Sequence, residues 1–222
     1  MKLPLDGPAT SDRQFINLGP DIASTILRTI EAGWVLALQS PNVNTSAGEV
    51  EITERLRDGM RQALNCERGE LSKTMVVLPG TESRSRPKVL IPDGRTDIPI
   101  LWIEIFFRFG EHDPHAIIEC KRIAGDNTGL CREYVVAGID RFQTGKYSEN
   151  HSTGFMVGYL IAGDANAAAL GVNRYLNSKS RCAENLKLSN LISESWAWGS
   201  CHPRTTNSPI ELHHAFLAFA AV

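Results

Sequence analysis

The sequence lacks the features that mark membrane and secreted proteins. It has no apolar run of about 18 residues, the length that a transmembrane helix requires. The segment Met1–Thr10 holds two prolines and lacks the apolar core of a secretory signal. The five cysteines are scattered and form no C-x-x-C pair, so we expect reduced thiols in a cytoplasmic protein. Cys182, Cys201 and His202 are an alternative zinc site, although their spacing matches no known ligand pattern.

The sequence also lacks repeats, low-complexity runs, a glycine-rich phosphate loop and an excess of positive charge. Its net charge is −2 and its pI about 6.3, which argues against binding nucleic acid through one broad basic face. Basic residues are instead clustered at Arg84, Arg86 and Lys88, and again between Lys121 and Lys146. We therefore expect a local positive groove, with a solvated charged surface as the alternative for the first cluster.

With 222 residues and 42% hydrophobic content, the chain can bury one core. We expect an N-terminal arm and helix over residues 1–47 and one domain over residues 48–222. Apolar residues at helical spacing and continuous apolar runs alternate along the chain. They predict helices at 20–38, 48–64, 130–142 and 164–176, and strands at 72–78, 98–107, 115–123, 154–162 and 210–219. This alternation indicates an α/β fold with a mixed sheet flanked by helices.

Two charged residues interrupt the apolar strand Ile117–Ile123. Side chains on a strand alternate between faces, so Glu119 and Lys121 point the same way and Cys120 the other. Charges within a buried strand are costly unless they are used. Asp97 begins the preceding strand, and an antiparallel hairpin would bring it close to Glu119. Two carboxylates beside a lysine can hold a hard divalent cation and orient an attacking water.

These residues resemble the signature of the PD-(D/E)XK nuclease superfamily, with Asp97, Glu119 and Lys121 at its three positions. The motif's proline is absent, since Thr96 precedes Asp97. Asp93, which follows a proline, is the alternative aspartate, but it lies within a turn sequence. The order helix, three strands, helix, strand matches the αβββαβ restriction-endonuclease-like core that the resemblance implies.

The resemblance also implies a metal site and a catalytic helix. Glu49 shares the inward stripe of the 48–64 helix, and such nucleases often carry a glutamate there; the alternative is an acidic residue stabilising the helix dipole. The implied cofactor is Mg²⁺, with Mn²⁺ as a substitute, bound by Asp97, Glu119, Glu49 and the carbonyl of Cys120. Lys121 would hold or deprotonate the attacking water, and acting as a base would require a lowered pKa.

The implied substrate is nucleic acid, with DNA favoured over RNA by the habit of the family. Arg141, Gln143, Lys146 and Tyr147 are candidate contacts, because a Gln-x-x-x-Tyr spacing occurs near the site in one branch of the superfamily. Capping and packing are the alternative roles for them. His202, Arg204 and His213 are further residues that we place near the substrate, with plain core or surface hydrogen bonding as the alternative.

The implied activity is that of a metal-dependent endonuclease in bacterial or phage defence, restriction or DNA repair. One active centre per chain would call for a homodimer or a partner subunit to cut both strands. Three other interpretations remain open. The fold could serve as an inactive nucleic-acid-binding module or as a scaffold subunit, or the three charged residues could form an ordinary salt-bridge cluster.

Overall fold

The computed structural model describes residues 17–66, 73–80, 82–83, 94–109, 114–147, 151–204 and 208–219. Asp93 and the basic residues Arg84, Arg86 and Lys88 lie outside the described residues, as does most of the expected N-terminal arm. None of the helices in the described part of the chain is long and apolar enough to cross a membrane.

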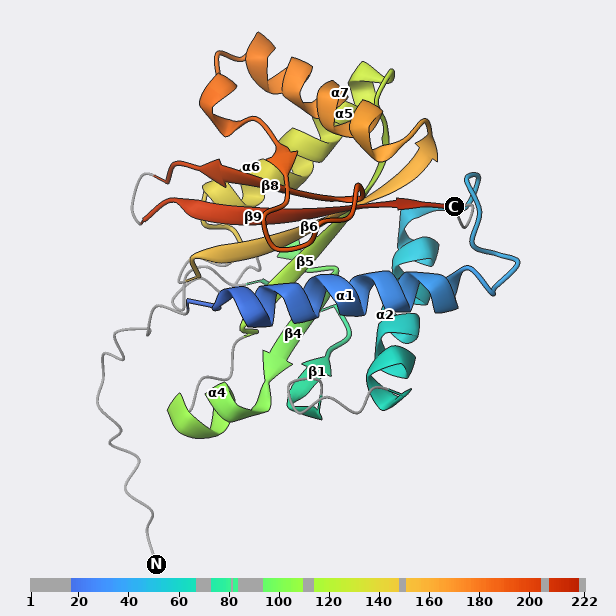
Figure 1. Ribbon diagram of the computed structural model, residues 1–222, viewed down its shortest axis with the longest axis vertical. Helices are drawn as coiled ribbons and strands as arrows, with labels where there is room; N and C mark the ends of the chain where they lie inside the picture. The colour runs from blue at the N-terminus through green and yellow to red at the C-terminus, as the bar shows by residue number, and fades with distance from the viewer. Residues whose placement is uncertain are drawn as a thin grey trace, which may run out of the picture.

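A seven-stranded mixed sheet forms the centre of the molecule, so the expected α/β fold with a mixed sheet is confirmed (Figure 1). The strand order is β1-β4-β5-β6-β9-β8-β7, in which β5, β6 and β9 run parallel and the other neighbours antiparallel. The strands are β1 (Met75–Val77), β4 (Ile98–Trp102), β5 (Ala116–Ala124), β6 (Thr153–Ala162), β7 (Lys187–Leu188), β8 (Ala197–His202) and β9 (Ile210–Ala218). A separate pair, β2 (Glu82–Ser83) and β3 (Gly94–Arg95), precedes β4.

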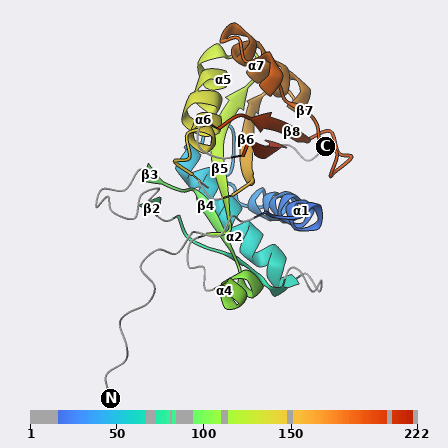
Figure 2. The same cartoon turned by 90° about the vertical axis from the view of Figure 1, so that its left-hand side faces the viewer.

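Helices cover both faces of the sheet, with α1 and α2 on one side and α5 to α7 on the other (Figure 2). The α-helices are α1 (Pro20–Ala37), α2 (Glu49–Cys66), α4 (Ile103–Phe109), α5 (Thr128–Tyr134), α6 (Asp140–Gln143) and α7 (Ala165–Ser178). A π-helix, η1 (Val135–Ile139), joins α5 to α6, and a short 3₁₀ turn, η2 (Cys182–Glu184), follows α7. Asp164 caps α7 by accepting a hydrogen bond from the backbone N–H of Ala167, a role that its short acceptor side chain favours.

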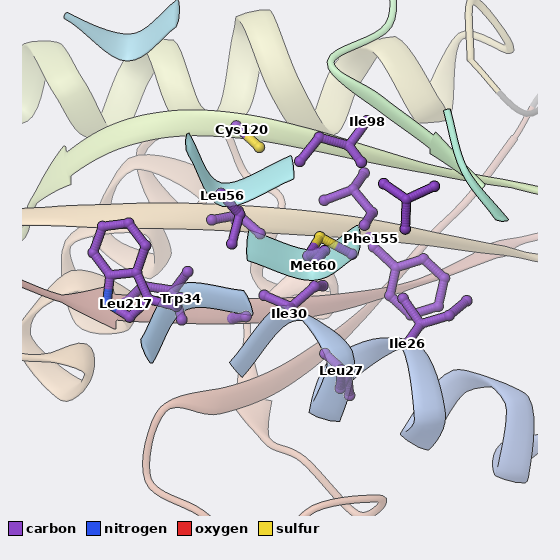
Figure 3. Packing of buried hydrophobic residues seen from close by; sticks show 14 of the residues in the cluster. Ile26, Leu27, Ile30, Trp34, Leu56, Met60, Ile98, Cys120, Phe155 and Leu217 are labelled. Atoms are coloured by element: carbon purple, nitrogen blue, oxygen red, sulfur yellow. The ribbon is translucent and has the colours of Figure 1, made fainter. Parts of the chain in front are cut away.

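The larger hydrophobic core lies between the sheet and the α1–α2 pair. Trp34 of α1, Met60 of α2 and Phe155 of β6 are among its buried side chains (Figure 3). The two helices touch at their glycines: a Cβ added to Gly59 would lie 2.1 Å from the carbonyl oxygen of Gly33. Helix α1, which the sequence placed in a separate N-terminal segment, thus shares one buried core with α2 and the sheet.

The β4–β5 hairpin sets the geometry of the candidate site. Its strands pair antiparallel with Ile98 opposite Ile118, which confirms the predicted hairpin. In this register, the residue before β4, Asp97, arrives beside the middle of β5, where Glu119 and Lys121 lie. The register itself was not predictable, because the apolar pattern is compatible with several alignments.

The strand predicted to run to Phe107 ends earlier. Strand β4 stops at Trp102, and residues 103–109 form helix α4. Pairing with β1 ends at Trp102 and pairing with β5 ends at Ile100, so a longer strand would leave its backbone groups without partners. A helix satisfies these groups internally, and it leaves Phe107 78% exposed instead of facing the core.

Candidate functional site

Asp97 is bound to the backbone of the neighbouring strand. Its Oδ2 atom accepts a hydrogen bond of 2.8 Å from the backbone N–H of Cys120. Cys120 points its side chain into the α1–α2 core, as the strand alternation predicted, so its backbone is fixed. The aspartate therefore lies at the middle of β5, between the positions of Glu119 and Lys121.

The ammonium of Lys121 is the centre of this cluster. It donates to Oε1 of Glu49 at 3.0 Å and to the carbonyl oxygen of Cys120 at 2.7 Å, and it lies 2.9 Å from Oε1 of Glu119. These contacts account for the three N–H donors of an ammonium group. The second oxygen of Glu49 accepts the backbone N–H of Arg122 at 3.1 Å, which ties the start of α2 to β5. The structure thus brings together Glu49, Glu119 and Lys121 from two separate elements.

Arg141 contacts the same oxygen of Glu119 as Lys121 does. Its Nη1 atom donates to Oε1 of Glu119 at 2.8 Å and to the hydroxyl of Tyr147 at 2.8 Å. That hydroxyl in turn donates to the carbonyl oxygen of Arg95 at 2.8 Å, two residues before Asp97. The chain Glu119–Arg141–Tyr147–Arg95 therefore joins β5, α6 and the segment that carries Asp97. The side chain of Arg141 remains 32% exposed, so part of its guanidinium faces solvent.

The π-helix η1 brings Arg141 to this position. A π-helix contains an extra residue per turn, so it rotates the residues that follow it relative to an uninterrupted α-helix. Gly138 within it packs closely on β6: an added Cβ would lie 2.4 Å from Cε of Met156 and 3.8 Å from Cγ of Lys121. A side chain at this position would have to displace the flexible end of Met156, so the glycine lets the helix pack close to the sheet beside Lys121.

Burial and charge set the protonation of the cluster. Burial, followed by the charge of Asp97, raises the pKa of Glu119 to about 7, although Lys121 and Arg141 act in the opposite direction. Burial also raises the pKa of Asp97. Burial alone would lower the pKa of Lys121, but Glu119, Glu49 and Asp97 together raise it above its ordinary value. The lowered pKa that a lysine needs to act as a general base is therefore not found for Lys121. In this arrangement its ammonium is a hydrogen-bond donor.

Two observations bear on whether these residues fit a divalent cation. Their donors are carboxylate and carbonyl oxygens, the ligands that Mg²⁺ prefers, and Oε2 of Glu119 is buried without a hydrogen-bond partner. Within the described residues, however, no three acidic, histidine or cysteine side chains are arranged around a common ion position. The ammonium of Lys121 lies among these oxygens. The oxygen atoms are therefore of the kind that a hard cation binds, but in this structure they surround the ammonium of Lys121.

The remaining predicted contacts lie around this cluster with different exposures. Tyr147 is fully buried and its hydroxyl is engaged on both sides. Gln143 accepts a hydrogen bond of 2.9 Å from Arg181, and Lys146 is half-buried in the turn after α6. Of the four residues, Arg141 contacts the acidic cluster directly, through Oε1 of Glu119.

The structure also contains a buried hydrogen-bond chain that the sequence did not reveal as a unit. Glu184 contacts Nδ1 of His202 at 2.6 Å, and Nε2 of His202 lies 2.6 Å from the hydroxyl of Ser200. The same hydroxyl lies 2.7 Å from Nε2 of His214, whose Nδ1 is 3.0 Å from the hydroxyl of Tyr134. Ser200 and His202 share a face of β8, and His214 lies beside them on β9.

The direction of this chain follows from its ends. Glu184, whose pKa is held at about 2 by His202 and Arg181 against the effect of burial, is ionised and can only accept. With a single proton on each imidazole, the His202 Nδ1–H donates to it, the Ser200 hydroxyl donates to His202, the His214 Nε2–H donates to Ser200, and the Tyr134 hydroxyl donates to His214. Every link carries one proton, and burial lowers the pKa of His214 well below its ordinary value, which keeps it neutral.

The order acid, histidine, serine is that of a hydrolytic triad, but access to the serine is missing. Ser200 is only 8% exposed. A cavity of about 460 Å³ lies near β8 and β9, but it is lined by Cys201, Glu211 and His213, which point to the opposite face of the sheet. Since Cys201 and His202 face opposite ways and both nitrogens of His202 are engaged, the alternative zinc site also has no geometric basis.

Arg204 is similarly used within the fold. It donates to the carbonyl oxygens of Phe142 at 3.1 Å and His151 at 2.8 Å. It thereby fixes the end of α6, one residue beyond Arg141.

Comparison with known proteins does not extend this description. No protein-family model, no curated protein and no solved structure matches the chain.

Proposed function

We propose that the protein is a metal-dependent nuclease of the PD-(D/E)XK type that hydrolyses phosphodiester bonds, with DNA as the favoured substrate. The observation that carries the proposal is the convergence of Asp97, Glu119, Lys121 and Glu49 from three separate elements. The order α2, β1, β4, β5, the α5–α6 segment and β6 also follows the αβββαβ core of that superfamily. The setting would be bacterial or phage defence, restriction or repair.

An ordinary salt-bridge cluster is a weaker explanation of the same residues. Burying Glu119 to 1% exposure beside Asp97 costs free energy, and its Oε2 atom has no partner to offset that cost. A cluster that served stability alone would be expected to satisfy this atom. An unsatisfied buried carboxylate oxygen, close to a second carboxylate, is better explained by a cation ligand.

In this mechanism the cation would be held by Asp97, Glu119, Glu49 and the carbonyl of Cys120. When bound, it supplies Lewis-acid polarisation of the phosphate and a lowered pKa for a coordinated water. Lys121, which is protonated here, stabilises negative charge on the phosphate oxygens and orients the water by donating hydrogen bonds. Arg141 presents the exposed part of its guanidinium to a phosphate while its Nη1 atom orients Glu119.

The proposal is tested by incubating the purified protein with supercoiled plasmid and with single-stranded DNA, in Mg²⁺, in Mn²⁺ and in EDTA. We expect metal-dependent cleavage that Lys121→Ala and Glu119→Gln abolish. Glu194→Gln, at an exposed position away from the site, is the matched control and should cleave like the parent.

Cleavage that survives both Lys121→Ala and Glu119→Gln would refute the site. Binding of DNA without cleavage in any metal would indicate an inactive nucleic-acid-binding module. Neither binding nor cleavage would favour a scaffold subunit.

A further inference from the structure

Lys121 makes contacts of an unusual kind for a catalytic lysine. Its three acceptors are Oε1 of Glu49, Oε1 of Glu119 and the carbonyl oxygen of Cys120, all between 2.7 and 3.0 Å. These are three of the four groups that the proposed function assigns to the cation. The ammonium therefore uses the cation's own ligands, and its three donors are saturated by them.

We infer that Lys121 is a tethered competitor for the divalent cation: its ammonium occupies the cation's oxygens and must leave before the cation can bind. The inference rests on the proposed function and adds a regulatory step at the same site.

Electrostatics make the two occupancies mutually exclusive. The side chain of Glu119 is 1% exposed and that of Lys121 is 10% exposed, so solvent screens the charges between them poorly. Adding a divalent cation to oxygens that already hold an ammonium would bring like charges into contact in a poorly screened site. Arg141 also contacts Oε1 of Glu119. Oε2 of Glu119 has no hydrogen-bond partner, but a cation bound there would still lie beside the two cationic side chains on Oε1, and its binding therefore favours movement of at least one of them.

Of these two side chains, the contacts indicate that Lys121 is the one that moves. Arg141 is also held by Tyr147, whereas each of the three acceptors around the Lys121 ammonium is itself a proposed cation ligand. The side chain of Glu49 is 35% exposed, so the ammonium has a route to solvent on that side. The long, flexible lysine stem allows such a displacement without a backbone change.

The consequence is a reduced apparent affinity for the cation. When the binding-competent arrangement is only part of the population, the apparent dissociation constant rises by the inverse of that fraction. Removing the ammonium should therefore strengthen cation binding while it abolishes cleavage. A lysine that stays beside the bound cation would also weaken cation binding by charge repulsion, so a gain in affinity supports the competition only together with displacement of the ammonium.

The test measures Mn²⁺ binding in the absence of nucleic acid, by electron paramagnetic resonance of the free ion. We expect Lys121→Met to bind Mn²⁺ about tenfold more tightly than the parent, or better, if the competent fraction is about a tenth. Lys179→Met removes the same charge at the end of α7 and should leave the affinity unchanged. Lys121→Met with Glu49→Gln should lose the gain, since it removes a ligand.

A second measurement uses the unmodified protein, in case Lys121→Met folds poorly. The ¹H–¹⁵N resonance of the Lys121 ammonium should be observable because burial and three hydrogen bonds slow its proton exchange. Titration with Mg²⁺ should remove or shift this resonance as the site fills, and should leave other lysine ammonium groups unaffected.

The outcomes separate this inference from the proposed function. Equal or weaker Mn²⁺ binding by Lys121→Met, together with loss of binding in Glu119→Gln, would overturn the competition and leave the cation site intact. An unchanged ammonium resonance at saturating Mg²⁺ would do the same. Absence of Mn²⁺ binding in the parent and in Lys121→Met would overturn the cation site itself, and the inference with it.

Discussion

The carboxylate of Asp97 accepts the backbone N–H of Cys120, so a residue of the candidate site also closes the β4–β5 hairpin at its open end. One side chain therefore has two separable properties. Its oxygen satisfies a backbone donor within the sheet, and its negative charge faces Lys121 and Glu119.

Asp97→Asn and Asp97→Ala should separate these two properties. The amide oxygen of asparagine can accept the N–H of Cys120, so we expect unfolding free energy within about 1 kcal/mol of the parent. Alanine leaves that N–H without a partner and should cost about 1–3 kcal/mol. Both variants should lose more than about 100-fold in cleavage rate. Urea denaturation and plasmid cleavage measure the two effects, and cleavage by Asp97→Asn at the parental rate would contradict the assignment.

Tyr147→Phe tests the link between α6 and the segment before β4. Without the hydroxyl, Nη1 of Arg141 and the carbonyl oxygen of Arg95 each lose a partner. We expect a loss of about 1–3 kcal/mol in stability and a 10- to 100-fold slower cleavage. Tyr175→Phe is the control, because that ring contacts Lys179 and its hydroxyl has no such role. An unchanged cleavage rate in Tyr147→Phe would show that the link does not position the site.

Ser200→Ala tests the buried hydrogen-bond chain. The substitution leaves Nε2 of His202 without its donor and Nε2 of His214 without its acceptor, in a fully buried environment. We expect a loss of about 2–4 kcal/mol in unfolding free energy, and no loss of cleavage beyond that due to unfolding. Ser193→Ala, at an exposed position, is the control. Loss of cleavage in a still-folded Ser200→Ala protein would instead give this serine a part in the chemistry.

The pH dependence of stability follows from the same chain. Burial, then the charges of His202 and His213, lower the pKa of His214, and burial also lowers that of His213. Below about pH 6.5 these two histidines bind protons in the unfolded chain but stay neutral in the folded chain. Stability therefore falls as the pH drops below about 6.5. The depressed pKa of Glu184, about 2, adds a further loss between about pH 4.5 and 2.

The contribution of Glu119 to stability depends on pH in the opposite way. Its effect must therefore be removed before the effect of the histidines can be measured. Its pKa of about 7 means that its contribution to stability is lost as the pH rises from about 4.5 to 7. In Glu119→Gln, the urea midpoint should therefore fall on going from pH 8 to pH 5. The double variant with His214→Gln should show a flatter dependence. A midpoint that rises on acidification of Glu119→Gln would contradict the sign.

Much of the local structure was predictable because it depends on neighbours in the chain. Strand alternation predicted that Glu119 and Lys121 share a face, and their 2.9 Å ion pair confirms it. A glycine just beyond an apolar helical stripe favours the end of a helix, and Gly145 adopts a φ of 74° just after α6. The hairpin that brings Asp97 to Glu119 followed from two apolar runs separated by a short loop.

What could not be predicted depends on partners distant in the sequence. The end of β4 is decided by where β1 and β5 stop pairing, and the π-helix by the close contact of Gly138 with β6. The partners of Lys121 required the register of β5 and the docking of α2. The buried chain joins η2, β8, β9 and α5, which are far apart in the sequence and meet only through the pairing of β8 with β9 and the packing of α5 on the sheet.

The π-helix decides which way the residues after it face. An ordinary α-helix with the same number of residues over Val135–Ile139 would turn Arg141 by roughly 100° around the helix axis, away from Glu119. Deleting one residue from this segment would remove the extra residue that the π-helix holds, and the resulting α-helix would keep Arg141 close to its present direction. Sequences with one residue fewer here should therefore keep the arginine facing the glutamate, whereas substitutions that straighten the segment at its present length should turn it away.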